Sequence, residues 1–197
     1  MKLTRIFPFA LTVLLALAAA LPLQAEEGVL SSDEIDYLYF MREEEKLARD
    51  VYLTLYREWG AEVFANIALS EQRHTDAVAE LIAGYGLTDP VQEDVIGEFI
   101  DPELAALYTE LVALGRQSLL DALYVGALIE EVDMEDIQHA MDLSDESEIL
   151  NVYDNLMRAS RNHLRGFVEV LASQGVKDYQ AQYIDQAWVD AILAEDT

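Results

Sequence analysis

An amphipathic pattern between residues 64 and 82 places charged side chains on the apolar side of a predicted helix. The apolar positions recur with the i, i+3, i+4, i+7 spacing of a helix that packs one face inward, and they are Phe64, Ile67, Ala68, Val78, Leu81 and Ile82. The same stripe passes through Glu71, His74 and Thr75. A fold for this chain therefore has to accommodate a carboxylate and an imidazole inside its core.

Similar patterns predict an all-α protein. We expect long helices at about residues 32–59, 62–83, 117–132 and 148–173, with the third ending near 132 or continuing through 141. Shorter helices are expected at about 103–114 and within 178–193. The connection between the second and third long helices contains Pro90 and Pro102 and is long, so these two helices should run parallel in a four-helix bundle.

Three other predicted helices also carry polar residues on their inner faces. On the first, the apolar line passes through Glu45 and Tyr52, with Glu43 and Glu44 to either side; taken alone, Glu45 would be an edge residue. On the third, Glu130 and Asp133 interrupt the apolar line, whereas Glu131 is offset by one position and should face solvent. Helical phase favours Glu130 over Glu131 as the inward residue, although a shift of one residue would exchange them.

Two of the three histidines lie on predicted inner faces. His163 falls within the inner line of the fourth long helix, and His74 lies three residues after Glu71, so both members of that pair face the same side of their helix. The third histidine, His139, is expected at the surface. An isolated Glu–His pair is often only a satisfied buried histidine.

Taken together, these residues need more than a structural explanation. Up to four carboxylates would enter one core, and burying uncompensated charge costs several kcal/mol per ion. Either the carboxylates are protonated or cations lie among them. Carboxylates from separate helices with two imidazoles form the ligand set of a dinuclear iron or manganese site. The candidate metal ligands are Glu45, Glu71, His74, Glu130, Asp133 and His163.

These motifs resemble the ferritin-like superfamily, and its rubrerythrin-like branch in particular. Glu45, Ala48 and Tyr52 follow the E-x-x-A-x-x-x-Y pattern of a first helix, and Glu71 with His74 the E-x-x-H pattern of a second. The phrases GALIEEVDMEDI and SRNHLRGF are similar to those of exported bacterial ferritin-like domain proteins. The resemblance covers about residues 33–172 and implies a ferritin-like four-helix bundle, with one long crossover between helices two and three and short accessory helices.

The resemblance also implies a role for each candidate residue. Glu71 and Glu130 would bridge two iron ions, manganese being the alternative. Glu45 and His74 would hold one ion, and Asp133 and His163 the other. Tyr52 would hydrogen-bond a ligand carboxylate or limit radical damage.

Two departures from the family pattern bear on these implied roles. Ser160 stands where the last E-x-x-H motif carries glutamate, which leaves His163 as the strong ligand of its helix. The chain has no cysteine, so the rubredoxin module of classical rubrerythrins is absent and redox turnover would need an external electron donor.

The N-terminal residues and the net charge limit the expected location and partners of the protein. Residues 1–25 have a basic head, an apolar run and small residues before Ala25, the layout of a cleaved signal peptide, although the apolar run approaches the length of a membrane anchor. We expect residues 26–197 to form one exported domain, periplasmic or secreted. A net charge of −26 argues against nucleic acid or an anionic membrane as a partner.

Three functions are consistent with these features. The first is a dinuclear metal protein, of peroxidase or ferroxidase type, that reacts with peroxide or dioxygen. The second is a non-catalytic metal-binding protein, and the third is a metal-free helical bundle that binds a partner. A homodimer is compatible with each of them.

Overall fold

The computed structural model describes residues 29–195, and the predicted signal peptide lies outside this range. All regular elements within it are helices: α1 (Ser32–Trp59), α2 (Glu62–Gly84), α3 (Pro102–Gly115), α4 (Leu119–Leu143), α5 (Ser147–Ser173) and α6 (Gln186–Leu193). The all-α prediction is therefore confirmed. The third long helix continues beyond residue 132, as the longer of its two predicted extents allowed.

Helix ends follow local sequence signals. Ser31 caps α1 in a reciprocal capping box with Glu34, and Gly60 ends the helix in the left-handed conformation that glycine adopts without strain. Ser118 caps α4 through the backbone N–H of Asp121. Asp101 and Pro102 begin α3, where a proline at the first helical position loses no hydrogen bond.

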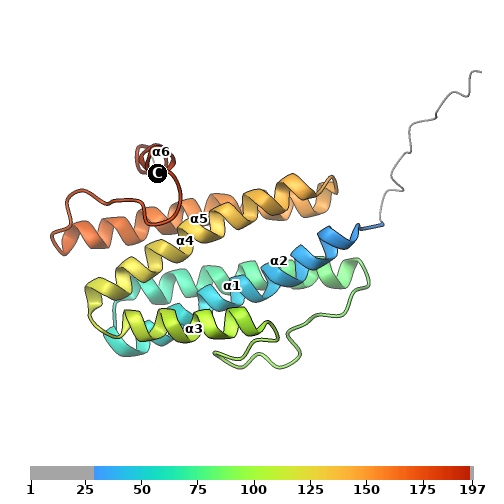
Figure 1. The fold of residues 1–197 in the computed structure, drawn as a ribbon, viewed down its shortest axis with the longest axis horizontal. Helices are drawn as coiled ribbons and strands as arrows, with labels where there is room; N and C mark the ends of the chain where they lie inside the picture. Colours follow the sequence, from blue (N-terminus) through green and yellow to red (C-terminus); the bar gives the residue numbers. More distant parts are fainter. Residues whose placement is uncertain (1–28, 196–197) are drawn as a thin grey trace, which may run out of the picture.

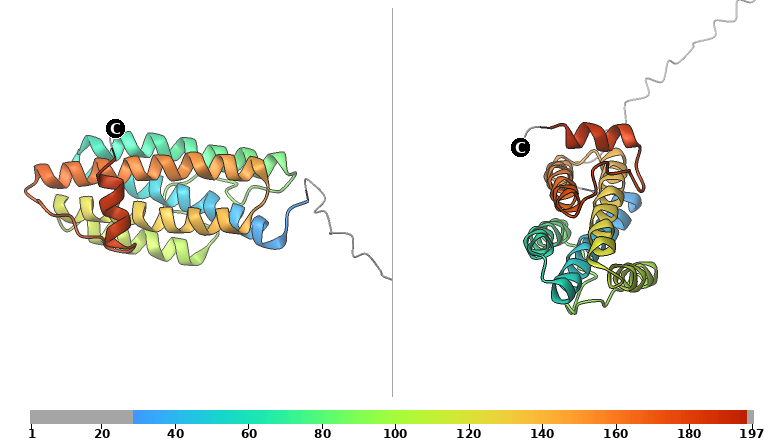
Figure 2. Two further views of the ribbon diagram at one scale, coloured as in Figure 1. Left: turned by 90° about the horizontal axis from the view of Figure 1, so that it is seen from above. Right: turned by 90° about the vertical axis from the view of Figure 1, so that its left-hand side faces the viewer.

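The four long helices form a bundle in two hairpins, α1–α2 and α4–α5 (Figure 1). A connection that includes α3 returns along the bundle from the end of α2, so that α2 and α4 run in the same direction. Helix α3 packs on α1 and α4, and α6 lies across α5 (Figure 2). None of the helices at residues 29–195 is long and apolar enough to cross a membrane.

The apolar core is divided into two clusters along the bundle. One cluster contains Leu38, Val78, Ile137 and Tyr153, near the beginning of α1 and α5 and the end of α2 and α4. The other contains residues such as Phe64, Leu123 and Phe167 near the opposite end. The inward polar residues lie between the two clusters, at the middle of all four long helices.

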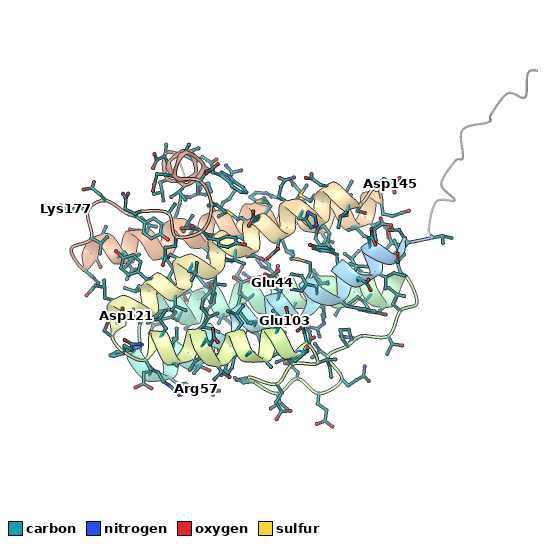
Figure 3. The ribbon with its side chains drawn as sticks, viewed as in Figure 1. Glu44, Arg57, Glu103, Asp121, Asp145 and Lys177 are labelled. Carbon is teal, nitrogen blue, oxygen red and sulfur yellow. The ribbon has the colours of Figure 1, made fainter. Side chains whose placement is uncertain are left out.

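Helix α1 is buried along its full circumference, with every residue from 41 to 52 buried. Figure 3 shows Glu44 on this helix within the bundle, whereas Asp145 and Lys177 lie at its periphery. This differs from the sequence-based view of α1, which placed Glu43 and Glu44 beside the apolar line. The reason is that the crossover between α2 and α4 covers the outer side of α1.

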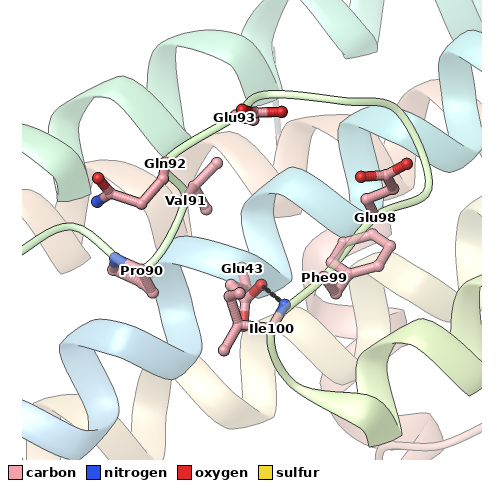
Figure 4. Close-up of a pocket in the computed structure, with 8 residues that line it drawn as sticks. All are labelled: Glu43, Pro90, Val91, Gln92, Glu93, Glu98, Phe99 and Ile100. Atoms are coloured by element: carbon pink, nitrogen blue, oxygen red, sulfur yellow. Dashed lines mark hydrogen bonds between the residues drawn. The ribbon is translucent and has the colours of Figure 1, made fainter.

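Charged residues of α1 hold this crossover in place. Glu43 accepts hydrogen bonds from the backbone N–H groups of Ile100 and Asp101 at 2.6 and 2.9 Å, at the edge of a hollow of about 300 Å³ (Figure 4). The ammonium group of Lys46 is fully buried, 2.6 Å from Asp50 and 2.8 Å from the carbonyl oxygen of Val95. These contacts take the place of the water that the charged side chains lose on burial.

Lys46→Met should lower the free energy of unfolding by roughly 3 kcal/mol, because it removes one of the two cations beside Asp50 and the donor to the carbonyl oxygens of Val95 and Glu98. Lys177→Met is the control, since Lys177 is exposed and the same change there should have little effect. Urea denaturation of both variants measures the difference. Equal stabilities would contradict a structural role for the buried ammonium group.

Substitutions at Gly126 and Gly166 form a second pair of test and control. A Cβ atom on Gly126 would overlap the ring of Phe167, whereas one on Gly166 would meet only Ile67 Cδ1, at 3.9 Å. Gly126→Ala should therefore destabilise the protein by about 1–3 kcal/mol. Gly166→Ala should be neutral or stabilising by up to about 1 kcal/mol, because alanine favours helix. Thermal unfolding distinguishes the two, and a stable Gly126→Ala variant would contradict the close packing.

Candidate metal centre

The polar layer between the two apolar clusters contains five side chains from all four long helices. They are Glu45 of α1, Glu71 and His74 of α2, Glu130 of α4 and His163 of α5. Each lies near the middle of its helix, so the bundle brings them to the same level. The three carboxylates are 1% exposed and the two histidines 8%.

Glu71 lies between the two histidines and presents one oxygen to each. Its Oε2 is 2.7 Å from Nδ1 of His74, and its Oε1 is 2.8 Å from Nδ1 of His163. The two imidazole rings are stacked, with centroids 5.5 Å apart. One carboxylate thus links both imidazoles.

A second carboxylate faces each imidazole. Glu45 Oε2 lies 3.1 Å from Nδ1 of His74, and Glu130 Oε2 lies 3.4 Å from Nδ1 of His163. Two groups of three side chains result, Glu45–Glu71–His74 and Glu71–Glu130–His163, and each could hold a metal ion. Glu71 belongs to both groups, so two ions held there would share this residue.

The electrostatics of the layer are dominated by burial and by these short contacts. Burial alone would lower the pKa of His74, but Glu45 and Glu71 outweigh it and raise that pKa to about 11. Burial likewise opposes charge on His163, and Glu130 and Glu71 raise its pKa to about 10. For Glu71, burial acts to raise the pKa, but the two histidines lower it to about 2. Without a metal ion, each imidazole therefore keeps a proton between two carboxylates.

Tyr52 contacts the layer from the apolar cluster that contains Phe167. Its side chain is fully buried, and its hydroxyl donates a hydrogen bond to Glu130 Oε1 at 2.6 Å. The expected hydrogen bond between Tyr52 and a candidate ligand carboxylate is thus present. It leaves Glu130 Oε2 directed toward His163.

Asp133 lies one turn after Glu130 and belongs to neither group of three. Ser160 donates a hydrogen bond to its Oδ2. Burial raises the pKa of Asp133 well above its usual range, and the neighbouring carboxylate with the largest further effect is Glu45. Ser160, which replaces the expected glutamate, therefore holds this carboxyl group instead of offering a carboxylate of its own.

Glu131 does not face solvent, and the sequence-based prediction was wrong on this point. Its side chain is fully buried because the segment before α6 wraps around it. Tyr179 donates its hydroxyl proton to Glu131 Oε1 at 2.6 Å, and the backbone N–H groups of residues 182–184 donate to the carboxylate at 2.6–3.1 Å. Glu131 thus ties the C-terminal segment to α4, immediately beside Glu130.

Glu44 was also not identified as an inward residue from the sequence. It is buried, its Oε2 has no hydrogen-bond partner among the described residues, and burial raises its pKa well above the usual range, with Asp136 and Asp133 adding to this effect. The burial of Glu44 follows from the burial of α1 on all sides, which the sequence pattern did not predict. His139, by contrast, is exposed as predicted.

Comparisons with known proteins place the chain in a family. Residues 34–196 match the family described as "Uncharacterized protein domain (DUF2202)", and the chain belongs to this family. The chain is similar to uncharacterized protein MJ0754 of Methanocaldococcus jannaschii, with 47% identity over 168 residues, which cover 85% of this chain and 90% of that protein. The crystal structure of that hypothetical protein superposes with a TM-score of 0.83, covering 86% of this chain and 96% of the other.

Binding of Mn²⁺ at neutral pH should release protons, because a metal ligand must be deprotonated and both buried histidines have raised pKa values. We expect at least two protons per chain at full loading, one from each imidazole, and an apparent affinity that rises with pH up to about 10. Calorimetric titration in two buffers of different ionisation enthalpy measures the release. His139→Gln should behave like the unaltered protein, and binding without proton release would contradict ligation by the histidines.

Proposed function

We propose that this protein binds two metal ions at the polar layer and uses them to react with peroxide or dioxygen. The observation that carries the proposal is a set of buried atoms without hydrogen-bond partners. Of the seven such side-chain atoms in the described part of the chain, four belong to candidate ligands: Glu45 Oε1, Glu71 Oε1, Asp133 Oδ1 and His163 Nδ1. Buried polar atoms normally have partners, and metal ions would supply them here.

Glu71 and His163 support this argument most directly. Their facing atoms form an ion pair at 2.8 Å, but the angles between them are poor for a hydrogen bond, so both atoms are available to a metal ion. The donor set of carboxylate oxygens and imidazole nitrogens fits iron or manganese, and the absence of cysteine leaves no thiolate to favour a softer ion.

Each ion would be held by one group of three side chains. Glu45 and His74 would bind the first ion, Glu130 and His163 the second, and Glu71 would bind both. Asp133 would add a fourth carboxylate beside the centre, although it belongs to neither group of three. The sequence resemblance alone had paired Asp133 with His163.

A ferritin-like classification, with rubrerythrin as the nearer relative, is part of the proposal. Its support is the bundle of two hairpins, the parallel arrangement of α2 and α4, and the E-x-x-H motif on α2. We also propose that the protein is exported and that residues 1–25 are removed, on the strength of the sequence pattern alone.

Two bound ferrous ions would supply two electrons, which with two protons convert hydrogen peroxide into two molecules of water. Tyr52 would fix the orientation of Glu130 through its hydrogen bond. Burial and the neighbouring carboxylates raise the pKa of Asp133, so without a metal ion this carboxyl group would hold a proton beside the centre, even though the hydrogen bond from Ser160 to its Oδ2 acts to lower that pKa. An external electron donor would return the ions to the ferrous state.

Metal content under anaerobic ferrous loading tests the proposal. The unaltered protein should retain about two iron ions per chain after desalting, and Glu71→Gln should lose most of both, because Glu71 is shared. Glu80→Gln is the matched control: it lies on the same helix and is exposed, so its iron content should be unchanged.

The outcomes separate the candidate functions. Retention of iron together with consumption of peroxide supports the proposal, whereas retention without consumption favours non-catalytic metal handling. If neither the unaltered protein nor the control retains iron or manganese, the metal centre is excluded. A metal-free bundle that binds a partner would then be the better explanation.

A further inference from the structure

The candidate centre is closed on its carboxylate side and slightly open on its imidazole side. Glu45, Glu71 and Glu130 are 1% exposed, while His74 and His163 are each 8% exposed. A small molecule that reaches the centre would therefore meet the histidines first. Such a molecule would approach from the surface between α2 and α5, the two helices that carry the histidines.

A groove of about 490 Å³ lies between these two helices, which pack side by side (Figure 2). One of the residues that line it is His163 itself, so the groove reaches the candidate centre. The rest of its lining comes from α2, including Asn66 and Ile67, and from α5, including Asn162, Gly166 and Glu169.

The walls of the groove differ in charge from the protein as a whole. The chain carries a net charge of −26, but Glu169 is the single carboxylate among the groove-lining residues. Two amides, Asn66 of α2 and Asn162 of α5, also line the groove, and the Asn162 oxygen accepts a hydrogen bond from Arg165. An amide group can both donate and accept hydrogen bonds. Such walls suit a small neutral molecule with hydrogen-bonding oxygens better than a strongly charged one.

Gly166 leaves space on the α5 side of the groove. A Cβ atom at this position would touch only Cδ1 of Ile67, at an ordinary contact distance of 3.9 Å, so a larger side chain has room to extend into the groove. Gly166 lies one helical turn after His163 and therefore on the same side of α5. The space beside it adjoins the imidazole.

We propose that the α2–α5 groove is the route by which hydrogen peroxide reaches the candidate centre, and that Gly166 keeps this route open. The inference rests on the proposed function, since it names the substrate path to the same site. It assigns the amides of Asn66 and Asn162 to guiding a neutral peroxide toward His163. It also predicts that a side chain at position 166 long enough to fill the groove affects access without affecting metal binding.

Gly166→Leu tests the route, with Gly166→Ala as the matched control. Both variants remove the glycine from α5, but only leucine is long enough to fill the groove. In the iron-loaded protein, Gly166→Leu should slow oxidation by hydrogen peroxide about tenfold relative to Gly166→Ala, with unchanged iron content. In the Mn²⁺-loaded protein, Gly166→Leu should also lower the water-proton relaxivity, because water of similar size would use the same path.

The combination of readouts distinguishes the possible failures. If the unaltered protein binds no metal, the proposed function falls and the inference falls with it. If metal binds but peroxide does not react, peroxide as the substrate is excluded, and the relaxivity still decides whether the groove admits small neutral molecules. If Gly166→Leu matches Gly166→Ala in both measurements, the route is overturned. Asn66→Trp, which narrows the groove from α2, gives the same decision should Gly166→Leu fail to fold.

Discussion

The rest of the interior depends on the two contacts of the Glu71 carboxylate, whose oxygens lie against the imidazoles of His74 and His163. Charge at this depth persists only with partners close by, and the partners come from all four long helices. The apolar core is accordingly divided into two clusters with the polar layer between them. The bundle thus combines two hydrophobic cores with one polar centre.

The sequence made the helices and much of the polar layer predictable, because both follow the helical period. Glu71, His74 and His163 occupy positions where apolar residues would continue the pattern, and this alone places them inside. Which of these residues could hold a metal ion is a further question, since the answer depends on distances between helices that periodicity does not specify. Asp133 shows this: it lies on the predicted inner line, yet Ser160 holds it and it belongs to neither group of three.

Two features of the fold explain the residues that were missed from the sequence. A pattern analysis assumes that a helix has one buried face and one solvated face, and α1 has no solvated face between residues 41 and 52. Glu43 and Glu131 are buried by segments without helical period, the crossover and the residues before α6. Backbone N–H groups in these segments donate hydrogen bonds to the two carboxylates, and no local sequence pattern predicts a backbone donor from a distant segment.

The two groups of candidate ligands differ in how far along the chain they extend. Glu45, Glu71 and His74 all belong to the first hairpin, within a span of 29 residues, whereas the second group joins that hairpin to Glu130 and His163 of the other. Contacts between residues close in sequence form at a lower entropic cost than contacts between distant ones. During synthesis the first half of the centre is therefore complete as soon as α1 and α2 pair. The second half forms only when the later hairpin packs against the first, and Glu71 is the residue that both halves share.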